Sequence, residues 1–292
     1  MYELIQVSDK CYYIQSPAKI GLVITGDDEV CLIDSGNDRD AGKRIKRILE
    51  EKGWSLNAIY NTHAHADHCG GNQYLQKQTG CDIYASEIER DFAEHTILEP
   101  SYLFGADPPE ELKHKFLMAR GCDAMLMTKE SMPEGMEMIP LPGHSFDMVG
   151  FRVSDDVVFL ADCISSEETL HKYQISFLVD VAAYLDTLEM IQEMEGRIFI
   201  PSHAEPTDDI SPLAKANIAK VRETGDTIVD ICTDSLPFDT ILKRIFDRYG
   251  LAMTFEQHAL VGSTVRSYLT WLKDEGRLTA SIEDNTLIWK KE

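Results

Sequence analysis

Thr62-His63-Ala64-His65-Ala66-Asp67-His68 is the stretch of this chain that decides its fold and its chemistry. It directly follows the apolar run Ala58-Ile59-Tyr60. An apolar strand fixes the backbone there, and the short polar loop after it aims the side chains. Residues two apart point the same way in extended chain, so His63 and His65 suit one metal ion. Asp67 and His68 are adjacent and diverge, so this pair could serve a second ion. Imidazole and carboxylate groups are ligands for Zn, Fe or Mn.

The length of 292 residues and the hydrophobic content of 43% are those of an ordinary globular chain. This length fits one large domain, or one domain with a smaller appendage. No apolar run approaches the ~20 residues that span a membrane. The start, Met1-Tyr2-Glu3-Leu4, lacks the basic and apolar regions of a secretory signal. We therefore expect a cytoplasmic protein.

The net charge limits the kinds of binding partner that we expect, and the cysteine spacing indicates the state of the thiols. The formal net charge is −22, which disfavours nucleic acid and anionic membranes because both require a cationic surface. The seven cysteines are scattered and form no C-x-x-C pair. We expect reduced, mostly buried thiols rather than a zinc ribbon or a redox pair.

Strand and helix patterns alternate along the first two hundred residues. Residues 11–14, 20–24 and 30–33 have strand composition, residues 40–52 have helical spacing, and Gly53 fits a helix end. After the motif, we expect a helix from near Asp67 to residue 78, a strand at 81–85 and a helix at 87–95. Such alternation is typical of a layered α/β fold. Residues 96–135 interrupt it as an insertion or lid, with one helix near residues 109–120.

Three later strand patterns also end at a possible metal ligand. A strand at 136–141 leads to His144, a strand at 157–160 leads to Asp162, and a strand at 197–200 leads to His203. The first two strands flank residues 148–153, which form a hairpin with 157–160. If the strands are parallel, their ends meet the opening motif at one edge of the fold.

The pattern changes after residue 210. We expect helices at residues 212–233, 238–249, 254–260 and 263–274, followed by a hairpin at 278–289. The last three of these helices and the hairpin look like a winged helix. Residues 238–292 are neutral overall, however, and this favours packing or oligomerisation over DNA binding. The predicted division is a metal-binding domain at 1–210 and a helical, winged-helix-like domain at 211–292.

Together these residues resemble the metallo-β-lactamase superfamily, in particular the hydrolytic branch that includes glyoxalase II. The resemblance rests on seven residues in the family's order, supported by Asp34-Ser35-Gly36 and Pro142-Gly143-His144-Ser145: His63, His65, Asp67, His68, His144, Asp162 and His203. It implies an αβ/βα four-layer sandwich over about residues 10–206. The trailing helices are similar to those of several superfamily hydrolases.

The resemblance also implies a dinuclear metal centre. One ion would be held by His63, His65 and His144, the other by Asp67, His68 and His203, with Asp162 bridging them. The expected cofactors are two divalent ions, Zn in the first place and Fe or Mn as alternatives. A hydroxide shared by the metals would attack a small ester, thioester, lactone or phosphodiester, with Asp67 orienting it or passing on a proton.

Two departures from glyoxalase II concern the substrate. The glycine of His-Gly-Glu-Pro is replaced in His203-Ala204-Glu205-Pro206, and the basic C-terminal cluster that binds glutathione is missing. Two other classes stay open: an iron redox enzyme of the same fold, resembling a persulfide dioxygenase or an oxygen reductase, and a DNA-binding regulator. The expected partner is a small molecule, without nucleic acid or membrane, and a homodimer is one option.

Overall fold

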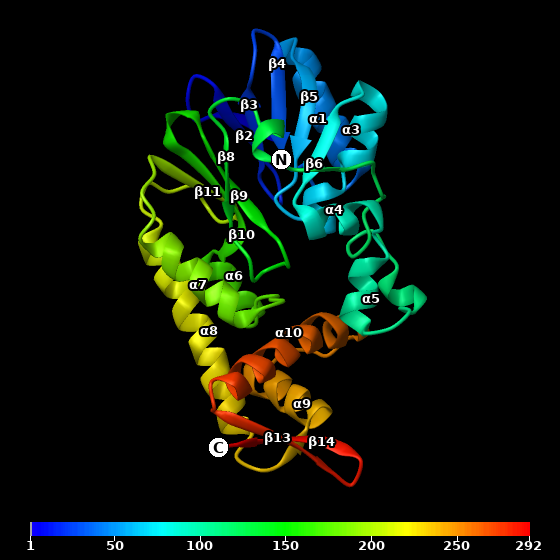
Figure 1. Cartoon of the computed structure of the whole chain (residues 1–292), viewed down its shortest axis with the longest axis vertical. Coiled ribbons are helices and arrows are strands. Elements are labelled where there is room, and N and C mark those ends of the chain that lie inside the picture. Colours follow the sequence, from blue (N-terminus) through cyan, green and yellow to red (C-terminus); the bar gives the residue numbers. More distant parts are fainter. Residues whose placement is uncertain (1) are drawn as a thin grey trace.

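The first of two stacked β-sheets contains the opening motif. The computed structural model describes residues 2–292 (Figure 1). The seven strands of this sheet follow one another in chain order: β1 (Glu3–Gln6), β2 (Cys11–Gln15), β3 (Ile20–Ile24), β4 (Glu29–Ile33), β5 (Ser55–Tyr60), β6 (Asp82–Ala85) and β7 (Met125–Leu126). Neighbours are antiparallel as far as β4 and parallel from β4 to β7. The motif loop leaves the carboxyl end of β5.

The second sheet carries the three later candidate ligands. Its order is β11 (Ile198–His203), β10 (Val157–Ser165), β9 (Val149–Val153) and β8 (Glu137–Pro140). β9 is antiparallel to both neighbours, whereas β10 and β11 are parallel. Thus β8, β10 and β11 run in the same direction, and their carboxyl ends lie at one edge of the sheet. The expected convergence of strand ends is therefore confirmed for this sheet.

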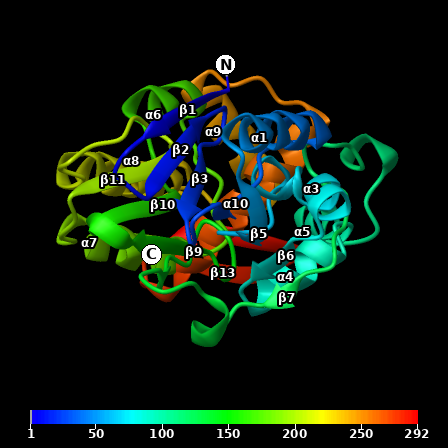
Figure 2. The same cartoon turned by 90° about the horizontal axis from the view of Figure 1, so that it is seen from above.

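Three hydrophobic clusters separate four layers. Buried side chains such as Phe151 and Phe159 fill the space between the sheets. On the outer face of the first sheet, α1 (Arg39–Lys52), α3 (Asn72–Thr79) and α4 (Glu87–Glu94) cover residues such as Ile59. On the outer face of the second, α7 (Val181–Gln192) and α8 (Ser211–Ile231) bury Tyr184 and Leu188. Figure 2 shows these two helical layers on opposite sides of the paired sheets. The predicted αβ/βα sandwich is confirmed.

Local capping explains the first long helix. The Asp38 carboxylate accepts hydrogen bonds from the backbone N–H groups of Asp40 and Ala41, which are unpaired donors at the helix start. Gly53 ends the helix at φ +73°, in the left-handed region that glycine adopts without steric cost. The predicted helix and its glycine stop are both confirmed.

The single helix predicted from near Asp67 to residue 78 is wrong. The chain forms a short α2 (Ala66–Cys69) and then α3, separated by Gly70 and Gly71. A Cβ atom on Gly71 would lie 2.3 Å from the carbonyl oxygen of Ser35. The close contact between this turn and the β4 loop bends the chain, because only glycine leaves room for it.

The helix predicted near residues 109–120 is also wrong. Segment 96–135 instead contains α5 (Leu98–Phe104), the 3₁₀ turns η1 (Glu110–Leu112) and η2 (Lys129–Ser131), and strand β7. Phe116 is exposed, so residues 109–120 have no continuous apolar stripe to bury. Leu112 and Leu117 pack against Ala259 in a small satellite cluster, which joins this segment to the C-terminal part of the chain.

The C-terminal elements lie below the sandwich in Figure 1, at the end of the long helix α8. They are α9 (Phe238–Tyr249), α10 (Phe255–Asp274) and a small sheet of β12 (Leu236–Pro237), β13 (Leu278–Glu283) and β14 (Thr286–Lys291). The expected helices at 254–260 and 263–274 are one continuous helix, since Gly262 is tolerated within a packed element. One hydrophobic cluster runs from β8–β10 through α7 and α8 to α9 and α10. The division at residue 210 stays a prediction.

Short elements complete the chain: α6 (Glu167–Tyr173), which the sequence patterns did not predict, and the 3₁₀ turn η3 (Ser154–Asp156). All seven cysteines are buried and free, as expected. Across residues 2–292, no helix combines the length and the apolar character needed to cross a membrane.

Candidate metal centre

The seven candidate ligands come together at the carboxyl ends of the strands. They form two groups: His63, His65 and His144, and Asp67, His68, Asp162 and His203. Within each group, one potential ligand atom per residue lies within 4.8 Å of the others. The fold thus brings the four motif residues close to the three ligands that follow the later strands. Their assignment as metal ligands stays a prediction.

In the first group, imidazole nitrogens face one another rather than solvent. His65 Nδ1 lies 3.1 Å from His144 Nε2. His63 is completely buried, and its Nε2 has no hydrogen-bond partner. A buried nitrogen without a partner is costly unless an ion or water satisfies it. Three converging imidazoles are a common ligand set for Zn²⁺.

The second group is centred on Asp162. Its Oδ1 lies 3.1 Å from His68 Nε2, and its Oδ2 lies 3.2 Å from His203 Nε2 and 3.7 Å from His144 Nε2. The approach of His68 to Asp162 lacks the angles of a hydrogen bond, so both atoms are buried and unpaired. The Asp162 carboxylate therefore lies between the two groups, where it can offer one oxygen to each of two cations.

In four of the histidines, Nδ1, the ring nitrogen that points away from the centre, has its own hydrogen-bond acceptor. Nδ1 of His144 donates to the Phe177 carbonyl at 3.0 Å, and Nδ1 of His203 donates to the Pro17 carbonyl at 3.0 Å. Nδ1 of His68 donates to Asp34 at 2.8 Å, and Nδ1 of His63 lies 3.0 Å from Thr62 Oγ1. Each contact fixes the ring so that Nε2 is directed at the centre, as in protein metal sites.

Asp34 organises the motif loop from the end of β4. Its carboxylate accepts hydrogen bonds from the backbone N–H and the hydroxyl of Thr62, each at 2.8 Å, as well as from His68. Asp34 adopts φ +65°, and Ala161, directly before Asp162, adopts φ +51°. Left-handed backbone is uncommon for residues other than glycine and occurs where the fold must aim a side chain.

Glu89, which the sequence patterns did not single out, joins both loops of the first group. It is 3% exposed, and its carboxylate accepts from the Ala64 backbone N–H at 2.9 Å, from Ser145 Oγ at 2.7 Å and from the Asp147 backbone N–H at 3.1 Å. Ala64 lies between His63 and His65, and Ser145 follows His144. A single buried carboxylate thus sets the separation of the two ligand loops.

Glu99 was also not predicted. It lies on α5, with Oε1 3.9 Å from His65 Nε2, on the side of the ring away from His144. Burial raises the pKa of Glu99 well above its usual range, and the nearby carboxylates of Asp67 and Glu89 add to this. Neither glutamate carried a sequence signal, because each lies on a helix, Glu89 on α4 and Glu99 on α5, and not in a ligand motif directly after a strand.

The two groups differ in protonation. Burial lowers the pKa of His65 to about 4 and that of His144 to about 4, so both are neutral at pH 7. In contrast, the Asp162 carboxylate raises the pKa of His203 to about 10. Burial lowers the pKa of His68, but Asp162, Asp67 and Asp34 outweigh it and raise the pKa well above its usual value. A cation in the second group would displace these protons.

A cavity of about 760 Å³ adjoins the metal centre. His144, Asp162 and His203 line one end of it, and Leu260 and Thr264 of α10 line another side. Residues 96–135 contribute nothing to its lining, although this segment was the predicted lid. The volume lies in the range of small-molecule sites.

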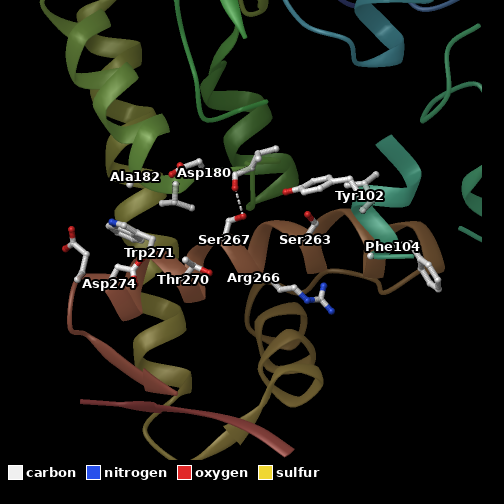
Figure 3. A pocket seen from close by; sticks show the side chains of 15 residues that line it. Tyr102, Phe104, Asp180, Ala182, Ser263, Arg266, Ser267, Thr270, Trp271 and Asp274 are labelled. Atoms are coloured by element: carbon white, nitrogen blue, oxygen red, sulfur yellow. Dashed lines mark hydrogen bonds between the residues drawn. The ribbon is translucent and has the colours of Figure 1, made fainter. Parts of the chain in front are cut away.

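Figure 3 shows a second cavity of about 690 Å³ between α5, α7 and α10. Its lining includes Tyr102, Arg266 and Trp271 but none of the seven candidate ligands. On its wall, the Ser267 hydroxyl donates to the Val179 carbonyl at 2.7 Å and ties α10 to the start of α7. This cavity is therefore separate from the metal centre.

Comparison of the sequence with curated proteins finds hydrolases. The chain is 30% identical over 121 residues to a hydroxyacylglutathione hydrolase of Methylococcus capsulatus, an alignment covering 41% of this chain and 38% of that protein. It is 26% identical over 145 residues to the probable metallo-hydrolase YqgX of Bacillus subtilis, covering 48% of this chain and 64% of that protein. The chain thus spans less than two thirds of either relative.

Solved structures and a family model agree on the fold. A beta-lactamase domain protein from Burkholderia ambifaria superposes with a TM-score of 0.74 at 15% identity, over 99% of this chain and 94% of that one. A metallo-beta-lactamase family protein from Thermus thermophilus gives 0.72 at 14% identity, over 100% and 98%. The sequence model of the Metallo-beta-lactamase superfamily matches residues 18–203, more than half of the chain. The chain therefore belongs to the metallo-beta-lactamase superfamily.

Proposed function

We propose that this protein is a dinuclear metal-dependent hydrolase of a small ester, thioester, lactone or phosphodiester. The observation that carries the proposal is the position of Asp162, whose two oxygens lie within 3.1–3.7 Å of His68, His203 and His144. One carboxylate between two groups of imidazoles suits a pair of cations. The hydrolase names of the relatives support the same reaction class.

The residues present fit two divalent ions. The donor set is five imidazoles and two carboxylates without a thiolate, which suits Zn, Fe or Mn, and we propose Zn as the resident metal. His63, His65 and His144 would hold one ion, and Asp67, His68 and His203 the other, with Asp162 shared. When bound, the ions supply a water of lowered pKa as nucleophile and positive charge for the developing oxyanion.

The chain's own groups position the reaction. Asp67 is 41% exposed at its side chain, against 11% for Asp162, so it is the more accessible carboxylate. Burial raises the pKa of Asp67, but His68 and His203 lower it to about 2, so it is ionised at neutral pH. We assign it the orientation of the attacking water and a proton relay to the leaving group. The adjoining cavity holds the substrate and limits its size.

The test combines elemental analysis with a substrate screen. We expect two Zn per chain and hydrolysis of at least one ester, thioester, lactone or phosphodiester. His65→Ala and Asp162→Ala should lose metal and activity together, whereas His171→Ala, an exposed histidine outside the centre, should retain both. Full hydrolysis by protein with metal verifiably removed would refute the proposal, as would one Fe per chain with oxygen consumption.

A further inference from the structure

The cavity beside the metal centre is built by both halves of the chain. The turn between β2 and β3, the end of β11 and helix α6 form its walls on the sandwich side, and α10 lies opposite. Hydroxyl groups of Ser16, Ser165, Ser176 and Thr264 are among its lining. A substrate in the cavity therefore meets these hydroxyl groups and, at its exposed side, the charged side chains of Glu168, Lys172 and Glu205.

Lys19 differs from these exposed charged groups, because it is a buried lysine in the lining. It is 6% exposed and lies at the start of β3. Its Nζ donates to the carbonyl oxygen of Ala204 at 2.5 Å. Ala204 directly follows the candidate ligand His203, so the ammonium lies beside the metal centre.

The bonding of Lys19 is incomplete. An ammonium group has three donors, and only one contact, with a neutral carbonyl, is present. Within residues 2–292, no carboxylate oxygen lies within 4.0 Å of the Lys19 Nζ, the distance of an ion pair. Glu205, which also lines the cavity, is exposed; its charge acts on Lys19, but from beyond the distance of an ion pair. Buried charges are otherwise paired, because removing an unpaired charge from water costs much free energy.

We propose that Lys19 binds an anionic group of the substrate, a carboxylate or a phosphate, inside this cavity. This inference rests on the proposed function, since it names the class of substrate for the same centre. The anion adds hydrogen-bond acceptors for the ammonium and supplies a negative charge in direct contact with it, which the more distant Glu205 does not. A chain with a net charge of −22 repels anions at long range, so a buried cation at the reaction site gives selectivity that the surface does not.

The test measures binding to the metal-loaded full-length chain by titration calorimetry. The probes are benzoate, phenylphosphonate and the neutral benzamide, which share one ring and are not hydrolysed. We expect at least one anion to bind about 10- to 100-fold more tightly than benzamide, because its hydrogen bond with the Lys19 ammonium joins two charged groups. The two anions distinguish a carboxylate site from a phosphate site.

Matched variants assign the preference to Lys19. Lys19→Met and Lys19→Gln should lose it, and Lys19→Arg should keep most of it; glutamine retains a donor for the Ala204 carbonyl but no charge. Lys10→Met, a change at an exposed lysine on the turn between β1 and β2, should bind as the original chain does. Equal binding of anions by the original chain and Lys19→Gln would overturn the proposal, as would a lowered Tm with unchanged preference. Failure of every substrate in the hydrolysis screen would refute the proposed function without changing this binding result.

Discussion

At the residue scale, the candidate metal centre depends on acceptors that hold Nδ1 of four of its histidines. Asp34, the Phe177 carbonyl and the Pro17 carbonyl each accept a hydrogen bond from a different imidazole. Such contacts fix the tautomer and the direction of the ring, and their loss typically lowers metal affinity about 10- to 100-fold. Glu89 has a different role, because it positions two ligand loops through their backbone and a serine.

Glu89→Gln should weaken the first metal group selectively. The glutamine amide cannot accept hydrogen bonds at its nitrogen, so it faces the Ser145 hydroxyl or a backbone N–H without a partner. We expect a loss of about 10- to 100-fold in affinity at that group, measured by competition with a chelator. The second group should retain its metal, so the stoichiometry at limiting free metal falls toward one.

Glu87→Gln on the same helix is the matched control, since Glu87 is exposed. It should bind both ions as the original chain does. Glu89→Gln protein with unchanged affinity at both groups would show that Glu89 does not position the ligands.

Metal binding should release protons, because the metal-free centre holds them on His203 and His68. The pKa of His203 is about 10 in the metal-free protein, and that of His68 is raised well above its usual value. Both imidazoles are thus protonated at pH 7 and must lose a proton to bind an ion. Affinity for Zn²⁺ should increase with pH between about 6 and 9, with on the order of two protons released per chain.

Calorimetric titration in buffers of different ionisation enthalpy measures this release directly. The His203→Ala variant should release fewer protons. A pH-independent affinity over this range would contradict the predicted protonation of the second group.

At the element scale, each strand end is fixed by the element that packs beside it. β10 is the clearest case, because its end carries Asp162. Asn217 of α8 is 1% exposed; its Oδ1 accepts from the Ser165 backbone N–H at 3.0 Å, and its Nδ2 donates to the Ser165 carbonyl at 2.8 Å. This pair of bonds ties the helix to the strand three residues beyond the bridging carboxylate.

Asn217→Ala should lower the free energy of unfolding by about 1–2 kcal/mol, because the half-buried backbone N–H and carbonyl of Ser165 lose their side-chain partner. Urea denaturation of the metal-free protein measures the change. Lys215→Ala, at an exposed position of the same helix, should have no effect beyond about 0.5 kcal/mol. Equal stability of the two variants would contradict the role given to Asn217.

Some helices could be predicted from their local sequence pattern and others could not. α1 and α9 have a continuous apolar stripe and clear ends, so the local pattern was sufficient. Residues 109–120 have helical composition, but Phe116 stays exposed and the chain forms only the turn η1. α10 continues through Gly262, because packing against α5, α7 and α8 outweighs the cost of one glycine.

At the scale of the whole molecule, the C-terminal helices belong to the same packed body as the second sheet. Val261, Val265 and Leu269 of α10 share a hydrophobic cluster with Leu185 and Leu188 of α7. α10 also lines the cavity beside the metal centre. The face of α10 that carries these residues is thus occupied by contacts within the chain.

Deletion of residues 211–292 should therefore abolish cooperative folding of residues 1–210. Each large apolar side chain exposed by the deletion costs about 1.5–3 kcal/mol, and a few such residues exceed the total stability of about 5–15 kcal/mol. Circular dichroism during heating and size-exclusion chromatography measure the outcome. Ile282→Ser, at an exposed position of β13, should leave folding unchanged. A truncated protein with a cooperative transition and metal binding would support an independent domain instead.

The sequence by itself determined the layered fold and the seven residues that come together at its centre. It could do so because strand composition and the H-x-H-x-D-H spacing are local properties, and a polar residue after an apolar strand is carried to the sheet edge. Only the tertiary structure decided which groups hold those residues in place. Glu89, Glu99 and Lys19 reach the centre from elements that are remote in the chain. Their roles follow from burial and from unpaired hydrogen-bonding groups, which exist only once the layers have packed.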